Sequence, residues 1–267
     1  MSTEPTVPPR PDHLHPVPAA PPPPGEEEAP RREGATWSWV EAVGVYVVAF
    51  LIAGMLSLPV LNAFDEESDL ANMTATVVAA LVIVGILIGW LSIYHRGWVR
   101  VMRLPDRRRW GAEILAGVLF GLGLYVVAVV FVGGILLFLL NALSGDAVQA
   151  PEQVPQGLSA VGILVTSLYA IVIAPFGEEL FFRGVLFRSL RDRHGLRIGL
   201  LGTAVGFGLI HFIPGDAADA ALLMLVMAFT GASLGYLYER RGTIVAPIAA
   251  HMTFNVIGLA LILGLQQ

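Results

Sequence analysis

The residues that could perform chemistry interrupt apolar stretches in the second half of the chain. Glu178 and Glu179 end one stretch, His211 ends the next, and His251 and Asn255 lie within a third. An ionisable side chain at membrane depth costs roughly 2.5–3.5 kcal/mol, so these residues indicate a functional site. A desolvated carboxylate beside a histidine can activate water, and imidazole and amide donors can stabilise an oxyanion. This set of groups predicts amide hydrolysis without a covalent intermediate.

The spacing gives the two glutamates different roles. Glu179 and Arg183 are four residues apart, so on one helix they share a face and can form an ion pair. Glu178 is rotated about 100° from its neighbour and is left free for chemistry. The alternative is that both carboxylates only neutralise nearby arginines.

A turn near Gly195 would bring Glu178 and His211 together. Glu178 lies 17 residues before this glycine and His211 lies 16 residues after it. Residues equidistant from the turn of an antiparallel helical pair lie at the same level, so we expect the two side chains to meet. The pairs Phe207–His211 and His251–Asn255 each span four residues, so each pair shares one helix face.

A zinc site is the competing enzymatic interpretation. Glu178, His211 and His251 could bind zinc, with water as the fourth ligand. The chain contains no H-E-x-x-H, and it has no cysteine. We therefore expect no cofactor, and zinc is the alternative.

The elements that must position these residues are membrane helices. The 267 residues are 55% hydrophobic and 14% charged, whereas about 25% of the residues in a soluble domain are charged. Windows of about 20 residues almost without charge predict transmembrane helices. We expect an all-α polytopic membrane protein with about seven transmembrane helices, or alternatively eight, in a bundle around an intramembrane cavity. The expected spans are 38–63, 72–94, 112–142, 158–180, 198–213, 220–238 and 243–265.

The distribution of arginine predicts the orientation in the membrane. All 16 basic residues are arginines, and with seven spans they fall only in the N-terminal segment and in alternate connecting loops. The positive-inside rule makes this side cytoplasmic. We therefore expect a multi-pass protein of the cell membrane with its N-terminus in the cytoplasm and its C-terminus outside.

The chain divides into three expected regions. Residues 1–36 are rich in proline and are expected to form a disordered cytoplasmic tail. Residues 37–157 form an N-terminal scaffold of three spans, and residues 158–267 form the catalytic region of four spans. Five scaffold glycines are expected to allow close helix packing: Gly117, Gly121, Gly123, Gly133 and Gly134.

The polar residues resemble the three motifs of the CPBP intramembrane glutamic proteases, which include the type II CaaX prenyl endopeptidases and the bacterial Abi proteins. The family motif E-E-x-x-x-R resembles Glu178–Arg183, F-x-x-x-H resembles Phe207–His211, and H-x-x-x-N resembles His251–Asn255. The three motifs occur in the family's order, and the resemblance covers about residues 158–262.

This resemblance implies a metal-free glutamic endopeptidase. It implies that Glu178 and His211 activate water and that His251 and Asn255 form the oxyanion hole. The remaining motif residues are implied to support the site: Glu179, Arg183 and Phe207.

The expected substrate is a peptide or protein at the membrane, cut near the cytoplasmic leaflet. The expected partners are this substrate and the lipid bilayer, with no nucleic acid. The absence of lysine indicates a GC-rich, bacterial genome, in which prenylated CaaX proteins are not the expected target. The alternatives are a non-catalytic scaffold or immunity protein, a zinc-dependent membrane protease, and a transporter, for which no inverted repeat is visible.

Overall fold

All of the regular secondary structure in the described part of the protein is helical. The computed structural model describes residues 34–63, 69–96, 98–144 and 147–265, and no strand occurs among them. The predicted all-α fold is therefore confirmed for these residues. The proline-rich segment predicted to be a disordered tail lies outside the described residues, apart from 34–36.

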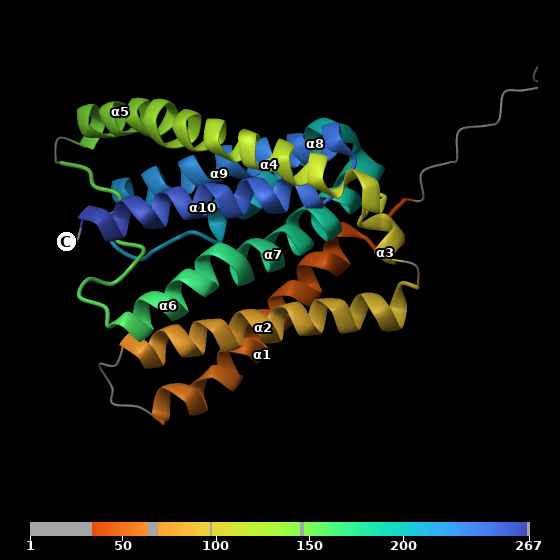
Figure 1. Ribbon diagram of the computed structural model, residues 1–267, viewed down its shortest axis with the longest axis horizontal. Helices are drawn as coiled ribbons and strands as arrows, with labels where there is room; N and C mark the ends of the chain where they lie inside the picture. The colour runs from red at the N-terminus through yellow and green to blue at the C-terminus, as the bar shows by residue number, and fades with distance from the viewer. Residues whose placement is uncertain (1–33, 64–68, 97, 145–146, 266–267) are drawn as a thin grey trace, which may run out of the picture. The chain divides into compact units, whose positions relative to one another are not determined.

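The first half of the chain contains two long helices and one longer helical run (Figure 1). The long helices are α1 (Trp39–Asn62) and α2 (Asp69–Tyr94), and α2 is followed by the short α3 (Trp98–Val101). A 3₁₀ turn, η1 (Arg107–Arg109), leads into the run. This run comprises α4 (Trp110–Tyr125), the π-helical η2 (Val126–Gly133) and α5 (Gly134–Ser144).

The second half of the chain carries the predicted site. Its first helical run contains two π-helical segments, η3 and η4, between α-helices. The run is followed by α9 (Ala217–Arg241) and α10 (Val245–Leu265). The members of the run are α6 (Ala160–Leu168), η3 (Tyr169–Ile173), α7 (Ala174–Glu179), η4 (Leu180–Phe187) and α8 (Arg188–Leu209).

Six helical runs in the described residues are long and apolar enough to cross a membrane. This number is close to the predicted seven, and the chain is a multi-pass membrane protein. The difference arises because two predicted spans, 158–180 and 198–213, lie in the single 50-residue run Ala160–Leu209.

This run folds back on itself at Gly195, where the backbone leaves the helical region (φ 84°, ψ 173°). A β-carbon on Gly199 would lie 3.0 Å from Cβ of Arg191, and one on Gly202 would lie 2.6 Å from Cδ1 of Leu190. Residues at similar distances before and after Gly195 are therefore in contact, so the two arms are antiparallel. The predicted turn near Gly195 is confirmed.

The connecting segments that carry arginine meet at one end of the described helices. Arg109 and Arg241, at the start of α4 and the end of α9, both donate to the buried Glu113 carboxylate, at 2.9 and 2.8 Å. His95, beyond α2, lies 3.1 Å from Glu41 in the first turn of α1. This grouping agrees with the segregation of arginine seen in the sequence.

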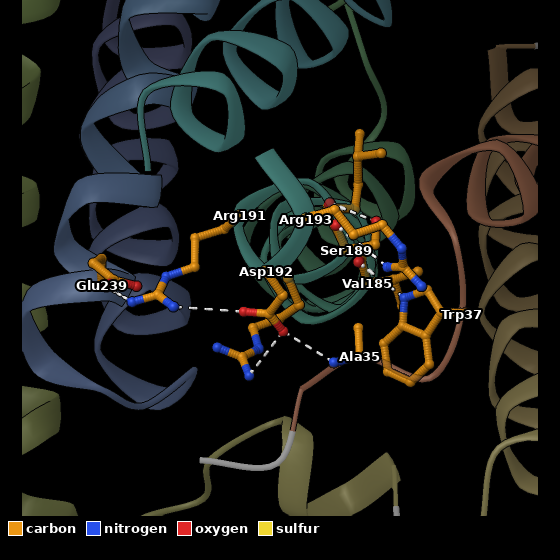
Figure 2. Close-up of polar contacts among 10 residues, drawn as sticks. Ala35, Trp37, Val185, Ser189, Arg191, Asp192, Arg193 and Glu239 are labelled. Atoms are coloured by element: carbon orange, nitrogen blue, oxygen red, sulfur yellow. Dashed lines mark hydrogen bonds and ion pairs between the residues drawn. The ribbon is translucent and has the colours of Figure 1, made fainter. Parts of the chain in front are cut away.

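The centre of the core is η4, because all eight of its residues are buried. A helix that is apolar nearly all round must be covered on every side. Part of the cover comes from the segment that precedes α1 (Figure 2). Trp37 is fully buried and donates its indole N–H to the Val185 carbonyl oxygen at 3.1 Å. The backbone N–H of Ala35 donates to Asp192 of α8 at 2.9 Å.

Helix α4 packs on α10, and two of the five predicted glycines allow this contact (Figure 1). A β-carbon on Gly117 would overlap the Ala246 carbonyl oxygen, and one on Gly121 would lie 2.5 Å from the carbonyl oxygen of Ala250. The remaining three glycines do not have this role. A β-carbon on Gly133 would make only ordinary contacts, at 3.4–3.5 Å. The prediction is wrong for Gly123 and Gly134, where an added β-carbon would have no atom within 4 Å.

Substitution of Gly121 by alanine is expected to destabilise the protein by about 1–3 kcal/mol, the usual cost of overpacking. The added methyl group meets a backbone carbonyl of α10, which cannot move without shifting that helix. Thermal unfolding in detergent measures the effect. Gly123→Ala is the matched control because it lies on the same helix with no atom within 4 Å. Equal unfolding temperatures for the two variants would contradict the proposed contact.

Candidate active site

A buried ion pair lies at the centre of the site. Glu179 and Arg183 are both fully buried, and Nη1 of Arg183 donates to Oε1 of Glu179 at 2.8 Å. The predicted i, i+4 pair is therefore present. Nη2 of Arg183 donates to the Gly231 carbonyl oxygen of α9 at 2.8 Å, and the guanidinium lies 4.9 Å above the centre of the Phe207 ring. The pair thus fixes η4 to α8 and α9.

Glu179 also fixes His251. Nδ1 of His251 lies 2.9 Å from the same Oε1 atom that accepts from Arg183. We assign the Nδ1 proton to this bond because a buried carboxylate can only accept. Spacing in the sequence did not reveal the contact, since the two residues are 72 positions apart. A buried carboxylate that orients a histidine is nevertheless a common arrangement in catalytic sites.

Glu178 has a different environment from its neighbour. Its side chain is 19% exposed, and its Oε2 atom is buried without a hydrogen bond to any described residue. Its carboxylate faces Nε2 of His251, with Oε2 at 3.9 Å from that nitrogen. This distance is too long for a hydrogen bond. Oε2 of Glu179 also lacks a hydrogen bond to a described residue, but its Oε1 accepts from Arg183 and His251, whereas Glu178 makes no hydrogen bond to a described residue at all.

His211 lies just beyond a helix rather than inside one. The predicted span 198–213 is too long at this end, because α8 ends at Leu209 and His211 belongs to the turn that follows. Nδ1 of His211 bonds to the Phe207 carbonyl oxygen at 2.7 Å, so Nε2 has no partner among the described residues. A carbonyl oxygen only accepts, so Nδ1 carries the proton and Nε2 is the basic nitrogen of neutral His211.

Phe207 lies beside both histidines. Its ring centre is 4.8 Å from that of His211 and 5.6 Å from that of His251. The structure therefore brings the two histidines to one aromatic side chain. The expected direct contact between His211 and Glu178 is not found within the 4.0 Å of an ion pair, and the histidine at that distance from Glu178 is His251. The correction arises because His211 follows the end of α8, where the helical periodicity stops.

Asn255 lies one helical turn beyond His251 on α10. Its Nδ2 donates to the Ala170 carbonyl oxygen of η3 at 2.7 Å. An amide nitrogen carries two hydrogens, so the second remains available to another acceptor. α7 lies between α2 and α10, which brings the glutamates and this face of α10 together (Figure 1).

Two tyrosines near Glu178 were not identified from the sequence. Tyr46 of α1 and Tyr169 of η3 both interact electrostatically with the Glu178 carboxylate. Tyr46 is the single polar group of the apolar stretch 42–56, which was an available signal, whereas Tyr169 follows Thr166 and Ser167 and does not stand out in this way.

The residues considered for zinc do not form a metal site in the described part of the chain. No group of three or more His, Asp or Glu side chains there is placed to hold a metal ion. Glu178, His211 and His251 therefore do not converge as a set of three ligands.

Residues 160–257 match the family model described as type II CAAX prenyl endopeptidase Rce1-like. The match begins at α6 and ends two residues after Asn255, so it includes every motif residue of the site. No solved structure matches the chain.

Two curated proteins are similar to the chain. "Putative membrane peptidase YdiL" of Bacillus subtilis (strain 168) is 30% identical over 98 residues, which are 37% of this chain and 36% of that protein. "Uncharacterized 24.3 kDa protein" of Escherichia coli is 28% identical over 174 residues, or 62% of this chain and 72% of that protein. The chain thus spans about a third of the length of the first relative. Over residues 160–257, the chain is similar to the Rce1-like type II CAAX prenyl endopeptidases.

Proposed function

We propose that the protein is an intramembrane endopeptidase that hydrolyses a peptide bond of a membrane-associated protein or peptide, with Glu178 as general base. The observation that carries this proposal is the contrast between the two glutamates. Oε1 of Glu179 accepts from Arg183 and His251, whereas Glu178 makes no hydrogen bond to a described residue and its buried Oε2 faces Nε2 of His251 at 3.9 Å. A desolvated, unpaired carboxylate is suited to accept a proton from water.

The proposed reaction is a direct attack of water on the scissile carbonyl carbon. Glu178 removes a proton from the water as the new C–O bond forms, and the carbonyl oxygen becomes an oxyanion. His211, whose Nδ1 is held by Phe207, offers Nε2 to the same water. Collapse of the tetrahedral intermediate then breaks the C–N bond, and Glu178 returns the proton to the leaving amine.

The proposed oxyanion hole is formed by His251 and Asn255. A protonated His251 donates from both ring nitrogens, one to Glu179 and the other to the oxyanion, and the Glu179 charge stabilises this cation. The free amide hydrogen of Asn255 supplies a second donor. Each such donor contributes about 10²- to 10³-fold to kcat.

The proposed reaction takes place within the membrane, at a site that a substrate reaches from the cytoplasmic leaflet. The arginine-bearing end of the helices is assigned to the cytoplasm by the positive-inside rule, which places the N-terminus inside and the C-terminus outside. The site lies between this end and the opposite one, since η4 and α7 are the middle segments of the run Ala160–Leu209.

Cleavage of a peptide library by the purified protein in lipid bilayers tests the proposal. Wild type and Glu178→Gln are compared, each with and without a chelator. We expect wild-type cleavage to persist under chelation and to be absent in the variant. Loss under chelation would replace the metal-free mechanism with a zinc-dependent one. Equal turnover by wild type and variant would overturn the general-base role, and no cleavage by wild type would favour a non-catalytic scaffold.

Glu179→Gln is expected to lower kcat by about 10²- to 10³-fold, the contribution of one oxyanion donor, with little change in KM. A glutamine oxygen can accept from both Arg183 and His251, so the two hydrogen bonds are kept while the charge that stabilises protonated His251 is lost. The buried Arg183 also loses its counterion, so the unfolding temperature is expected to fall as well. Steady-state kinetics measure the effect. The matched control is Glu239→Gln. It removes a carboxylate that pairs with Arg191 at 2.6 Å and that is not part of the site. Equal kcat values for the two variants would contradict the role of Glu179.

A further inference from the structure

The first helix contributes a polar group to the site. The Tyr46 ring of α1 stacks on the Phe181 ring, with centres 4.0 Å apart and planes at 24°. Phe181 follows Glu178 by three residues, within one helical turn. A ring stacked on Phe181 therefore lies near Glu178, and Tyr46 interacts electrostatically with that carboxylate.

A second tyrosine approaches the same carboxylate from another element. Tyr169 of η3 interacts electrostatically with Glu178 and with Tyr46. The next residue, Ala170, accepts the hydrogen bond of Asn255, so η3 is held against the site face of α10. Three polar groups from three segments thus surround one position: Tyr46, Tyr169 and Glu178.

These three groups have complementary hydrogen-bonding needs. Tyr46 and Tyr169 are half-buried, and among the described residues neither hydroxyl has a hydrogen-bond partner. Oε2 of Glu178 also has none. A phenol hydroxyl can donate a hydrogen bond, and an ionised carboxylate can only accept. One water molecule satisfies both kinds of group, because it accepts from a hydroxyl and donates to a carboxylate, and buried waters have two to four polar partners.

We infer that Tyr46 and Tyr169 hold the attacking water against Glu178, which makes Tyr46 a catalytic residue supplied by α1. This inference rests on the proposed function. The Tyr46 hydroxyl donates a hydrogen bond to the water oxygen, and one water proton points at Glu178. As the water oxygen bonds to the carbonyl carbon, that proton moves to Glu178 and the tyrosine keeps its own. α1 lies outside the segment 160–257 that matches the family.

The Tyr46→Phe variant tests the role of the hydroxyl independently of the role of the ring. Phenylalanine preserves the stacking on Phe181, so packing is retained and only the hydrogen bond to water is lost. We expect kcat to fall about 10- to 100-fold, as for loss of one hydrogen bond in a charged network, with KM changed less than about threefold. The matched control is Tyr125→Phe, whose ring packs on Phe254 of α10 at 5.1 Å, and we expect wild-type kcat.

A double-mutant cycle provides a readout that does not require turnover. The thermal unfolding temperatures of Tyr46→Phe, Glu178→Gln and the double variant are compared with wild type. If Tyr46 and Glu178 share a water, the changes in unfolding temperature caused by their two substitutions are expected to be non-additive. The changes caused by Tyr125→Phe and Glu178→Gln are expected to be additive. A purely structural role of the Tyr46 ring would leave both cycles additive.

The outcomes distinguish this inference from the proposed function. Wild-type kcat in Tyr46→Phe, together with an inactive Glu178→Gln, would overturn the role of Tyr46 alone. If wild type cleaves nothing and Glu178→Gln behaves the same, the proposed function fails and the assignment of Tyr46 fails with it. A reduced kcat with a coupled thermal cycle supports the inference.

Discussion

Glu178→Gln is expected to lower kcat by at least about 10³-fold without lowering the unfolding temperature. General-base catalysis contributes roughly 10²- to 10⁴-fold, and an amide of the same shape cannot accept the proton. Stability is expected to be equal or higher, because no described arginine lies within 4.0 Å of the carboxylate and its Oε2 atom is buried without a bond. Cleavage kinetics and thermal unfolding of the same preparation measure both effects.

The combination of a lost activity and a retained fold is the informative result for Glu178. Glu152→Gln serves as the matched control because it makes the same chemical change in a connecting segment, where the residue is exposed. Glu152→Gln is expected to leave both kcat and the unfolding temperature at the wild-type value. A Glu178→Gln variant that unfolds early would instead indicate a structural carboxylate.

Arg183→Met is expected to destabilise the protein by about 3–5 kcal/mol, which corresponds to a fall of about 10 °C in unfolding temperature. The substitution leaves the fully buried Glu179 without its cation, and it leaves the Gly231 carbonyl oxygen without its donor. Removal of one member of a buried ion pair costs more than the pair itself contributes, because the remaining charge stays desolvated. Arg107→Met, at an exposed position, is the control and is expected to have little effect.

A second variant tests the explanation for Arg183. In the double variant with Arg183→Met and Glu179→Leu, both charges are replaced by apolar groups, so most of the lost stability is expected to return. Activity is not expected to return, because His251 no longer has its carboxylate. A double variant as unstable as Arg183→Met would show that the buried charge is not the cause.

The features that could be predicted from the sequence are local. The membrane helices follow from apolar stretches of sufficient length, and the Glu179–Arg183 pair follows from the helix period. The fold-back at Gly195 was predicted because Glu178 and His211 lie at similar distances from a residue able to adopt positive φ.

The features that could not be predicted depend on tertiary contacts or on departures from the regular helix. The bond between Glu179 and His251 joins residues 72 positions apart, and no local period relates them. The end of α8 before His211 and the π-helical segments shift side chains away from the positions given by 3.6 residues per turn. The approach of Tyr46 to Glu178 depends on the packing of α1 against η4.

The burial of η4 limits how far the protein can be divided into interchangeable modules. The segment that matches the family begins at residue 160, yet Trp37 covers Val185 and Tyr46 covers Phe181. A fragment restricted to the matched segment would expose apolar surface of η4 and would lose one wall of the site. The smallest autonomous unit of this protein therefore includes α1, and a chimaera that exchanges the N-terminal helices must bring a partner for this surface with them.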